Sequence, residues 1–152
     1  MTKYEQLSSE AQRDGLTVKE LPLKHTKGIT VGSRIGIRTG QTSTEKACIL
    51  AEEIAHAKYT VGNILDQSDV SNRKQELFAR TKAYDQLIGL TGIIQIFENH
   101  CQNVYEAAEL LGVTEEFLTE ALERYRQKYG THTVCGNYII QFEPWLMVTK
   151  LI

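Results

Sequence analysis

Two carboxylates and an imidazole lie close together in the chain, at Glu52, Glu53 and His56. If this segment is helical, the side chains of Glu52 and His56 lie on one face of the helix, one turn apart. Two side chains in this arrangement can bind the same metal ion, while Glu53 can lean toward the same point. The spacing corresponds to H-E-x-x-H metalloproteases, in which two histidines bind zinc and the inner glutamate is the general base. Here the first position is Glu and not His.

A third metal ligand must come from another part of the chain. Glu76 is the best candidate, because it lies one turn into the next predicted helix. Two aspartates before that helix, Asp66 and Asp69, are competitors. Small residues would let the two helices approach closely: Ala51 and Ala55 on the first, Ala79 and Ala83 on the second.

A second interpretation treats Glu52, Glu53 and His56 as surface residues. Charged side chains four residues apart are common on solvated helix faces, where they serve no chemistry. The sequence that follows this segment, and the presence of Glu76, favour the metal site.

The helix that carries these residues is predicted to begin near Thr42 and to run to about Tyr59. Thr42 and Glu45 have the spacing of a capping box. Gly62-Asn63 is expected to end the helix, and 66–72 is expected to form a polar loop. The apolar side of the helix consists of Leu50, Ile54 and Val61.

Other elements follow from periodicity and from turn residues. Alternating apolar residues predict two short strands over 29–31 and 35–37, joined by a tight turn. The tail, 133–152, is rich in β-branched and aromatic residues and is expected to form a strand pair or an extended arm, with Gly136-Asn137 as a possible turn. Further helices are expected over 4–13, 73–88, 93–100 and 104–129. The last has a break at Leu111–Thr114, with Gly112 in the turn and Thr114 as the cap of its second helix.

This order of elements predicts an α+β fold in a single domain, 1–152, with a small antiparallel sheet. We expect the metal-binding part to span 1–89. A helical, helix-turn-helix-like part would span 90–130, and the extended or hairpin tail 131–152.

Three segments resemble the ImmA/IrrE family: Leu50–His56, Tyr59–Asn63 and Asn72–Glu76, the last opening a helix with Ala79 and Ala83. Family members are small zinc-dependent metallopeptidases of phages, mobile elements and bacteria. Their motif is H-E-x-x-H followed by a helix of pattern E-x-x-A-x-x-x-A.

This resemblance implies a zincin-like fold in which His56 and Glu76 are metal ligands and Glu53 is the catalytic acid/base. It also implies a repressor-type transcription factor as substrate, whose cleavage releases prophage or mobile-element genes. Glu52 would take the place of the first histidine.

That replacement changes the electrostatics of the expected metal site. Glu52, His56 and Glu76 would neutralise a zinc ion completely, so bound water would be polarised less and its pKa would rise above about 7. Two oxygens and one nitrogen also favour harder ions such as manganese, without excluding zinc. A catalytically inactive relative that binds the repressor without cleavage is therefore an alternative function.

The segment Ala107–Thr114, followed by Phe117, Leu118 and Leu122, has the pattern of a helix-turn-helix. A small DNA-binding regulator is thus a second alternative. The charge argues against DNA contact, because residues 105–129 hold six glutamates against three basic residues, a net charge of −3. A helical packing or protein-docking module fits this composition better.

The composition excludes several other classes of protein. The formal net charge is −2, and the longest apolar stretch, 87–97, is about half the length of a membrane-spanning helix. The N-terminal residues carry no apolar signal segment. Cys48, Cys101 and Cys135 form no disulfide pattern, so we expect reduced thiols and a cytoplasmic protein.

The other histidines are weaker candidates for chemistry. His100, beside Cys101, is expected to be a partly buried structural residue, while His25 and His132 lie in polar surroundings and are expected at the surface.

Overall fold

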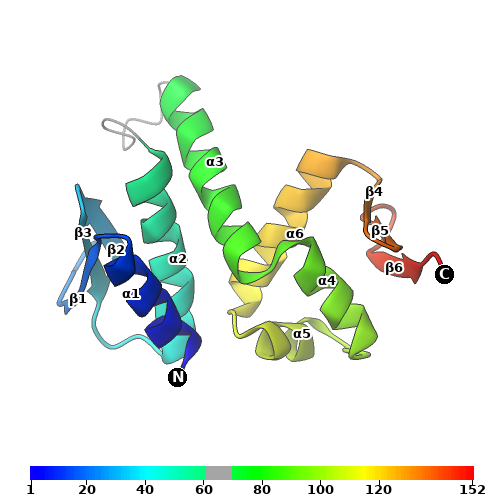
Figure 1. Ribbon diagram of the computed structural model, residues 1–152, viewed down its shortest axis with the longest axis horizontal. Coiled ribbons are helices and arrows are strands. Elements are labelled where there is room, and N and C mark those ends of the chain that lie inside the picture. The colour runs from blue at the N-terminus through cyan, green and yellow to red at the C-terminus, as the bar shows by residue number, and fades with distance from the viewer. Residues whose placement is uncertain (61–69) are drawn as a thin grey trace. The chain divides into compact units, whose positions relative to one another are not determined.

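The computed structural model describes residues 1–60 and 70–152 and has an α+β architecture (Figure 1). The fold class inferred from the sequence is confirmed. The chain divides into two compact units, Met1–Ala83 and Tyr84–Ile152, and the boundary falls inside helix α3 (Val70–Leu87).

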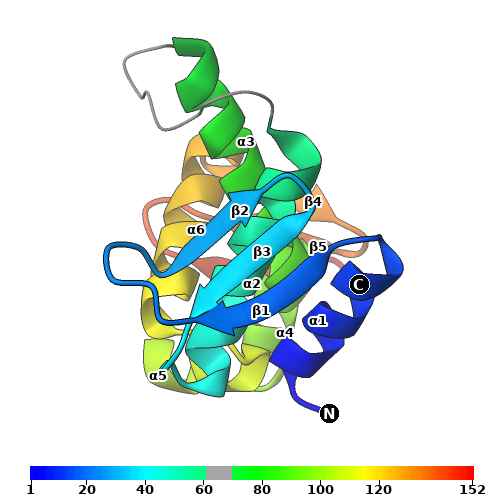
Figure 2. The ribbon, with the colours of Figure 1, turned by 90° about the vertical axis from the view of Figure 1, so that its left-hand side faces the viewer.

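The first unit is a three-stranded sheet with helices against it. The strands are β1 (Thr17–Leu21), β2 (Gly28–Val31) and β3 (Arg34–Arg38), in the spatial order β1-β3-β2 (Figure 2). The β2-β3 hairpin is antiparallel, as the sequence predicts. The predicted antiparallel pairing is therefore present, and β1 adds a pair that the sequence does not predict, because it runs parallel to β3. β1 itself falls in a segment where the sequence analysis assigns no strand.

Helices α1 (Lys3–Arg13) and α2 (Ser43–Tyr59) pack against each other and cover one face of this sheet. The core between the layers is made by Ile35 and Ile37 of the central strand and by Leu50 of α2, all at most 2% exposed. Burying such aliphatic side chains is the main force holding helix to sheet. The α2 backbone is therefore fixed against β2 and β3.

The start of α2 is set by the capping box expected from the sequence. The Thr42 hydroxyl accepts a hydrogen bond from the Glu45 backbone N–H at 3.1 Å, and the Glu45 carboxylate accepts one from the Thr42 N–H at 3.0 Å. Leu50 and Ile54 are buried, as predicted. The other predicted features, Val61, Gly62-Asn63, Asp66 and Asp69, lie outside the described residues.

Helix α3 begins at Val70, three residues earlier than the predicted Arg73. The last residues assigned to a polar loop, 70–72, are therefore helical. The α3 alanines Ala79 and Ala83 are fully buried.

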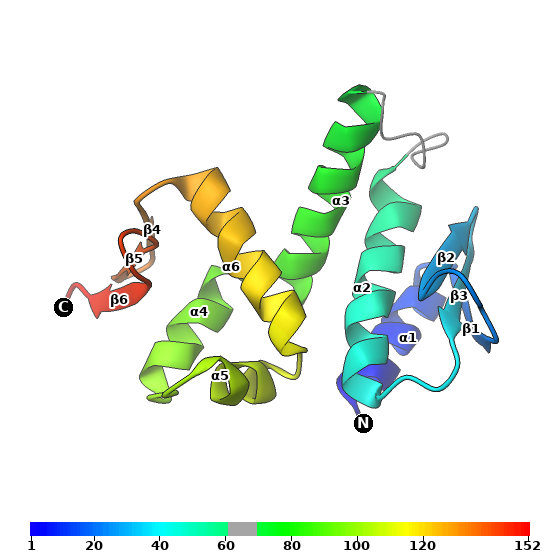
Figure 3. The same ribbon diagram turned by 180° about the vertical axis from the view of Figure 1, so that it is seen from behind.

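The second unit contains three further helices and a second sheet (Figure 3). The helices are α4 (Gly89–Glu98), α5 (Val104–Leu111) and α6 (Glu115–Tyr129). The strands are β4 (His132–Cys135), β5 (Tyr138–Gln141) and β6 (Met147–Lys150), antiparallel in the order β4-β5-β6. The tail thus forms the expected hairpin around Gly136-Asn137 and adds one more strand.

The break between α5 and α6 lies where the sequence predicts it. Gly112 takes a left-handed conformation, with φ of 70°, that favours glycine, and the Thr114 hydroxyl accepts a hydrogen bond from the Phe117 N–H at 3.1 Å. The break before α4 differs from the prediction. It falls at Ile88, and Gly92 lies inside α4, where a Cβ atom would come within 3.1 Å of the Ile88 side chain.

The structure also bears on the predictions for the histidines, the cysteines and membrane-spanning segments. His25 and His132 are exposed, as expected, but His100 is exposed rather than partly buried and has a positive φ of 54°. The three cysteines are free thiols, with Cys48 buried. Among the described residues, no helix combines the length and apolarity needed to cross a bilayer.

Candidate functional site

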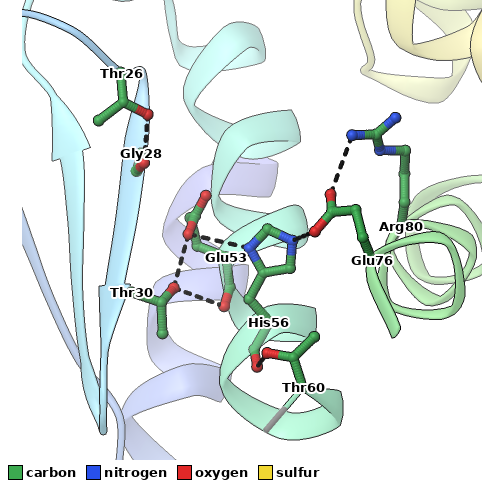
Figure 4. Close-up of polar contacts among 8 residues, drawn as sticks. All are labelled: Thr26, Gly28, Thr30, Glu53, His56, Thr60, Glu76 and Arg80. Carbon is green, nitrogen blue, oxygen red and sulfur yellow. Dashed lines mark hydrogen bonds and ion pairs between the residues drawn. The ribbon is translucent and has the colours of Figure 1, made fainter. Parts of the chain in front are cut away.

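The candidate site lies in the first unit, where β2, α2 and α3 each contribute a polar side chain (Figure 4). Glu53 and His56 come from α2 and point to neighbouring positions because they are three residues apart on the helix. Glu53 is buried, with 8% of its surface exposed, and the His56 side chain is 18% exposed. The Oε1 atom of Glu53 lies 3.5 Å from the Nδ1 atom of His56.

The second imidazole nitrogen of His56 meets α3. His56 Nε2 lies 2.9 Å from the Oε2 atom of Glu76, whose side chain is 19% exposed. The other oxygen of Glu76 accepts a hydrogen bond from the Arg80 guanidinium at 3.1 Å. The imidazole of His56 therefore lies between two carboxylates, that of Glu53 on α2 and that of Glu76 on α3. Arg80 holds the Glu76 carboxylate in place.

The strand side of the site is formed by Thr30 of β2. Its Oγ1 atom donates toward Glu53 Oε1 at 2.7 Å and also lies 3.1 Å from the Glu53 backbone oxygen. Thr30, Gly28 and Arg80 are not among the site residues predicted from the sequence.

The alternation of apolar and polar residues along β2 could have indicated that this strand contributes to the site. Residues 28 and 30 share one face of β2, and Ile29 and Val31 share the other. A strand against a helix normally turns its apolar residues inward, yet Ile29 and Val31 are 41% and 65% exposed. Gly28 and Thr30 face α2 instead. A strand that turns small and polar residues toward a helix, and apolar residues toward solvent, is a signal that the strand belongs to a site.

The two carboxylates determine the ionisation of His56. Hydrogen bonds to Glu53 first and to Glu76 second stabilise the protonated imidazolium and raise the pKa of His56 to about 10. Burial acts against this shift, and the negative charges of the two carboxylates add to it. In return, the imidazolium lowers the pKa of Glu76 below its usual value, and Arg80 adds to that effect. Without a bound cation, His56 is a positive charge at neutral pH.

Of the predicted ligands, the structure brings His56 and Glu76 together. Glu52 lies on α2 one turn before His56 and is half-buried. Within residues 1–60 and 70–152, no group of three or more His, Cys, Asp or Glu side chains is arranged to hold a metal ion. The three-ligand set of Glu52, His56 and Glu76 therefore stays a prediction.

The donor atoms that do meet are chemically suited to a divalent cation. Two ligands of a tetrahedral zinc ion, each about 2.0–2.1 Å from it, are roughly 3.3 Å apart. The 2.9 Å between His56 Nε2 and Glu76 Oε2 is slightly shorter, as expected for two groups that share a proton instead of an ion. A small separation of α2 and α3 side chains would convert the pair into two ligands.

Glu53 supplies a different chemical capability. It is a carboxylate beside the two donor atoms, shielded from most solvent, and its position is fixed by a hydroxyl on the neighbouring strand. Such a group can take a proton from water and return it to a leaving group if both lie within hydrogen-bonding distance. The site thus places an imidazole and a carboxylate, whose donor atoms suit a cation, beside a second, buried carboxylate, and metal-assisted hydrolysis uses groups of these kinds.

Comparison with known proteins tests this assignment. The family model described as the IrrE N-terminal-like domain, a peptidase family, matches residues 11–123, which include β1 to β3, α2, α3 and all of the candidate site. No curated protein and no solved structure gives a significant match to the chain. Since the family match covers most of the chain, the protein belongs to the ImmA/IrrE family of metallopeptidases.

Proposed function

We propose that the protein is a metal-dependent endopeptidase of phage or mobile-element origin that cleaves a repressor-type transcription factor. One observation carries the proposal: His56 Nε2 and Glu76 Oε2, from two different helices, meet at 2.9 Å beside the buried carboxylate of Glu53. Membership of the metallopeptidase family gives this arrangement its reaction class.

In this proposal His56, Glu76 and Glu52 hold the metal ion. The chemistry of one imidazole nitrogen and two carboxylate oxygens suits zinc, and manganese or another divalent ion is also compatible with it. When bound, the ion supplies Lewis acidity that polarises the scissile carbonyl group.

The protein side chains have separate tasks. Glu53 takes a proton from the attacking water and later donates it to the leaving amine. Arg80 holds Glu76 through the hydrogen bond to Oε1, so that Oε2 faces His56. Thr30 and the backbone of β2 shield Glu53 on the other side.

A catalytically inactive relative that binds the repressor is the second candidate, and a specific observation favours it. His56 already has two carboxylate partners, and its pKa of about 10 means that a metal must displace a proton at neutral pH. Glu52 in place of histidine would weaken the ion's effect on water further. For the third candidate, a DNA-binding regulator, the exposed glutamates Glu115, Glu116 and Glu120 in the first turns of α6 are unfavourable toward phosphates.

We place the activity in the cytoplasm, where a repressor would be found. The free thiols of Cys48, Cys101 and Cys135 support a reducing compartment.

The test combines elemental analysis of the purified chain with incubation of the cognate repressor, followed by mass spectrometry of the products. We expect a stoichiometric divalent metal and cleavage at a defined bond. Glu53→Gln should reduce the cleavage rate by at least about 100-fold, since it removes the acid/base. Glu20→Gln, which changes an exposed glutamate of the same unit, is the matched control.

One result would decide against the peptidase. A chain that binds the repressor in gel filtration, yet holds no metal and cleaves nothing, is the inactive relative. If Glu52→His then restores metal binding, the replaced histidine is the cause. A gel-shift experiment at moderate salt tests DNA binding separately.

A further inference from the structure

The carboxylate of Glu53 is held in place by a residue from outside the helix pair. Thr30 Oγ1 lies 2.7 Å from Glu53 Oε1, a short distance for a hydrogen bond between a hydroxyl and a carboxylate. The same hydroxyl is 3.1 Å from the Glu53 backbone oxygen, so Thr30 contacts both the backbone and the carboxylate of Glu53. This contact joins two segments that are 23 residues apart in sequence.

The contact restricts the last side-chain torsion of Glu53, which packing alone does not fix. The last bond of a glutamate side chain joins an sp³ carbon to a planar carboxylate, and its rotation has only a broad preference. A hydrogen bond to Oε1 fixes that rotation and therefore also fixes the direction of the lone pairs on Oε2. Proton transfer depends on that direction, because donor and acceptor must be aligned at about 2.6–3.2 Å.

A second feature of β2 closes the space behind the same side chain. An ideal Cβ atom built on Gly28 would lie 2.9 Å from Glu53 Cγ and 2.7 Å from Ile49 Cγ2, distances that real Cβ atoms essentially never show. It would also lie 3.0 Å from Glu53 Oε2. Only glycine at 28 therefore lets the strand approach closely enough for Thr30 to reach the carboxylate.

We propose that Thr30 is a positioning residue, which orients the Glu53 carboxylate for proton transfer, and that Gly28 provides the space for this orientation. The proposal rests on the endopeptidase function given above. It assigns a catalytic task to strand β2, which the helical motif by itself does not include.

Kinetics of the full chain, loaded with Zn²⁺ or Mn²⁺ and acting on the purified repressor, test the proposal. Thr30→Val keeps the shape of the side chain but removes the donor. We expect it to lower kcat by about 10-fold to 100-fold with little change in KM, because the lost hydrogen bond orients Glu53, which acts in the chemical step. Thr30→Ser keeps the hydroxyl and should retain kcat within about 3-fold of wild type.

Two further variants control the comparison. Gly28→Ala should lower kcat by a similar factor, since its methyl group displaces Glu53. Thr17→Val makes the same change as Thr30→Val at an exposed position of β1 in the same sheet and should have wild-type kinetics. Circular dichroism of each variant shows whether the fold is retained.

The outcomes separate this proposal from the function on which it rests. No cleavage by the wild-type chain would contradict the endopeptidase function and, with it, the catalytic task of Thr30. Cleavage by Thr30→Val at the wild-type kcat would contradict the role of Thr30 alone. A fall in kcat for Thr30→Ser as large as that for Thr30→Val would also contradict it, because the hydroxyl would then not be the cause. A crystal structure of Thr30→Val with an unchanged Glu53 carboxylate would overturn the proposal independently of activity.

Discussion

His56 has two roles that compete for the same nitrogen atom. Its Nε2 either shares a proton with Glu76, as in the structure, or binds a metal ion after that proton has left. The Glu53 and Glu76 carboxylates make the protonated form stable up to a pH of about 10. The ion pair therefore keeps Glu76 of α3 beside His56 of α2 when no cation is bound, and it also opposes the loading of the site at neutral and lower pH.

This ion pair predicts how the stability of the metal-free protein depends on pH. In the unfolded chain His56 titrates near 6.5, and in the folded chain near 10, so the folded state binds more protons between these values. The stabilisation is complete below about pH 6.5 and is lost as the pH rises through about 10. We expect the free energy of unfolding in chelator to fall, by at most about 1.4 kcal/mol per pH unit.

Urea denaturation at several pH values, followed by far-ultraviolet circular dichroism, measures this dependence. His56→Asn is the control, since it keeps a polar side chain but does not titrate, and its profile should be flatter between pH 7 and 9.5. A wild-type profile as flat as that of the variant would contradict the assignment of the ion pair.

At the scale of elements, α2 carries the chemistry and its start is fixed by local interactions. The capping box satisfies backbone N–H groups that have no partner within the helix. Glu53 and His56 lie about three and about four turns further along, so the start of the helix determines the direction in which they point. β2 then adds Thr30 from the sheet, and α3 adds Glu76.

Thr42→Ala should destabilise the first unit by about 1 kcal/mol, because it removes the hydroxyl that accepts the hydrogen bond from the Glu45 N–H. Urea denaturation measures the change. Ser43→Ala, at the exposed first helical residue, is the matched control and should change the stability by less than about 0.5 kcal/mol. Equal effects of the two variants would mean that the capping box does not stabilise α2.

At the scale of the whole molecule, the segment that matches the family model ends before the second folded unit does. The match ends at residue 123, but the core of the second unit continues beyond it. Tyr125 and Ile140 are fully buried, and Phe142 is 7% exposed and stacks on Tyr129 with ring centroids 6.0 Å apart. The β4-β5-β6 sheet is thus part of a core and not an appended arm.

Ile140→Ala should therefore destabilise the second unit by about 2–5 kcal/mol, the usual cost of removing a buried aliphatic side chain. Val134→Ala, on the adjacent strand β4 at 59% exposure, is the control and should have an effect within about 0.5 kcal/mol. Urea denaturation of the full chain compares the two variants. A loss of stability in Ile140→Ala no larger than in the control would show that the sheet is dispensable.

The sequence by itself determined the features that depend on near neighbours in the chain. The capping box at Thr42, the turn at Gly112 and the N-cap at Thr114 are local interactions, and all three are present as predicted. The spacing of Glu53 and His56 on one helix is local in the same sense, as is the β2-β3 hairpin.

Only the tertiary structure decided which distant groups meet. That Glu76 approaches His56 depends on how α3 lies beside α2, and the contact of Thr30 with Glu53 depends on the packing of β2 on α2. The parallel pairing of β1 with β3 is equally non-local. Such contacts arise from the burial of side chains across the whole unit, and no short stretch of sequence encodes them.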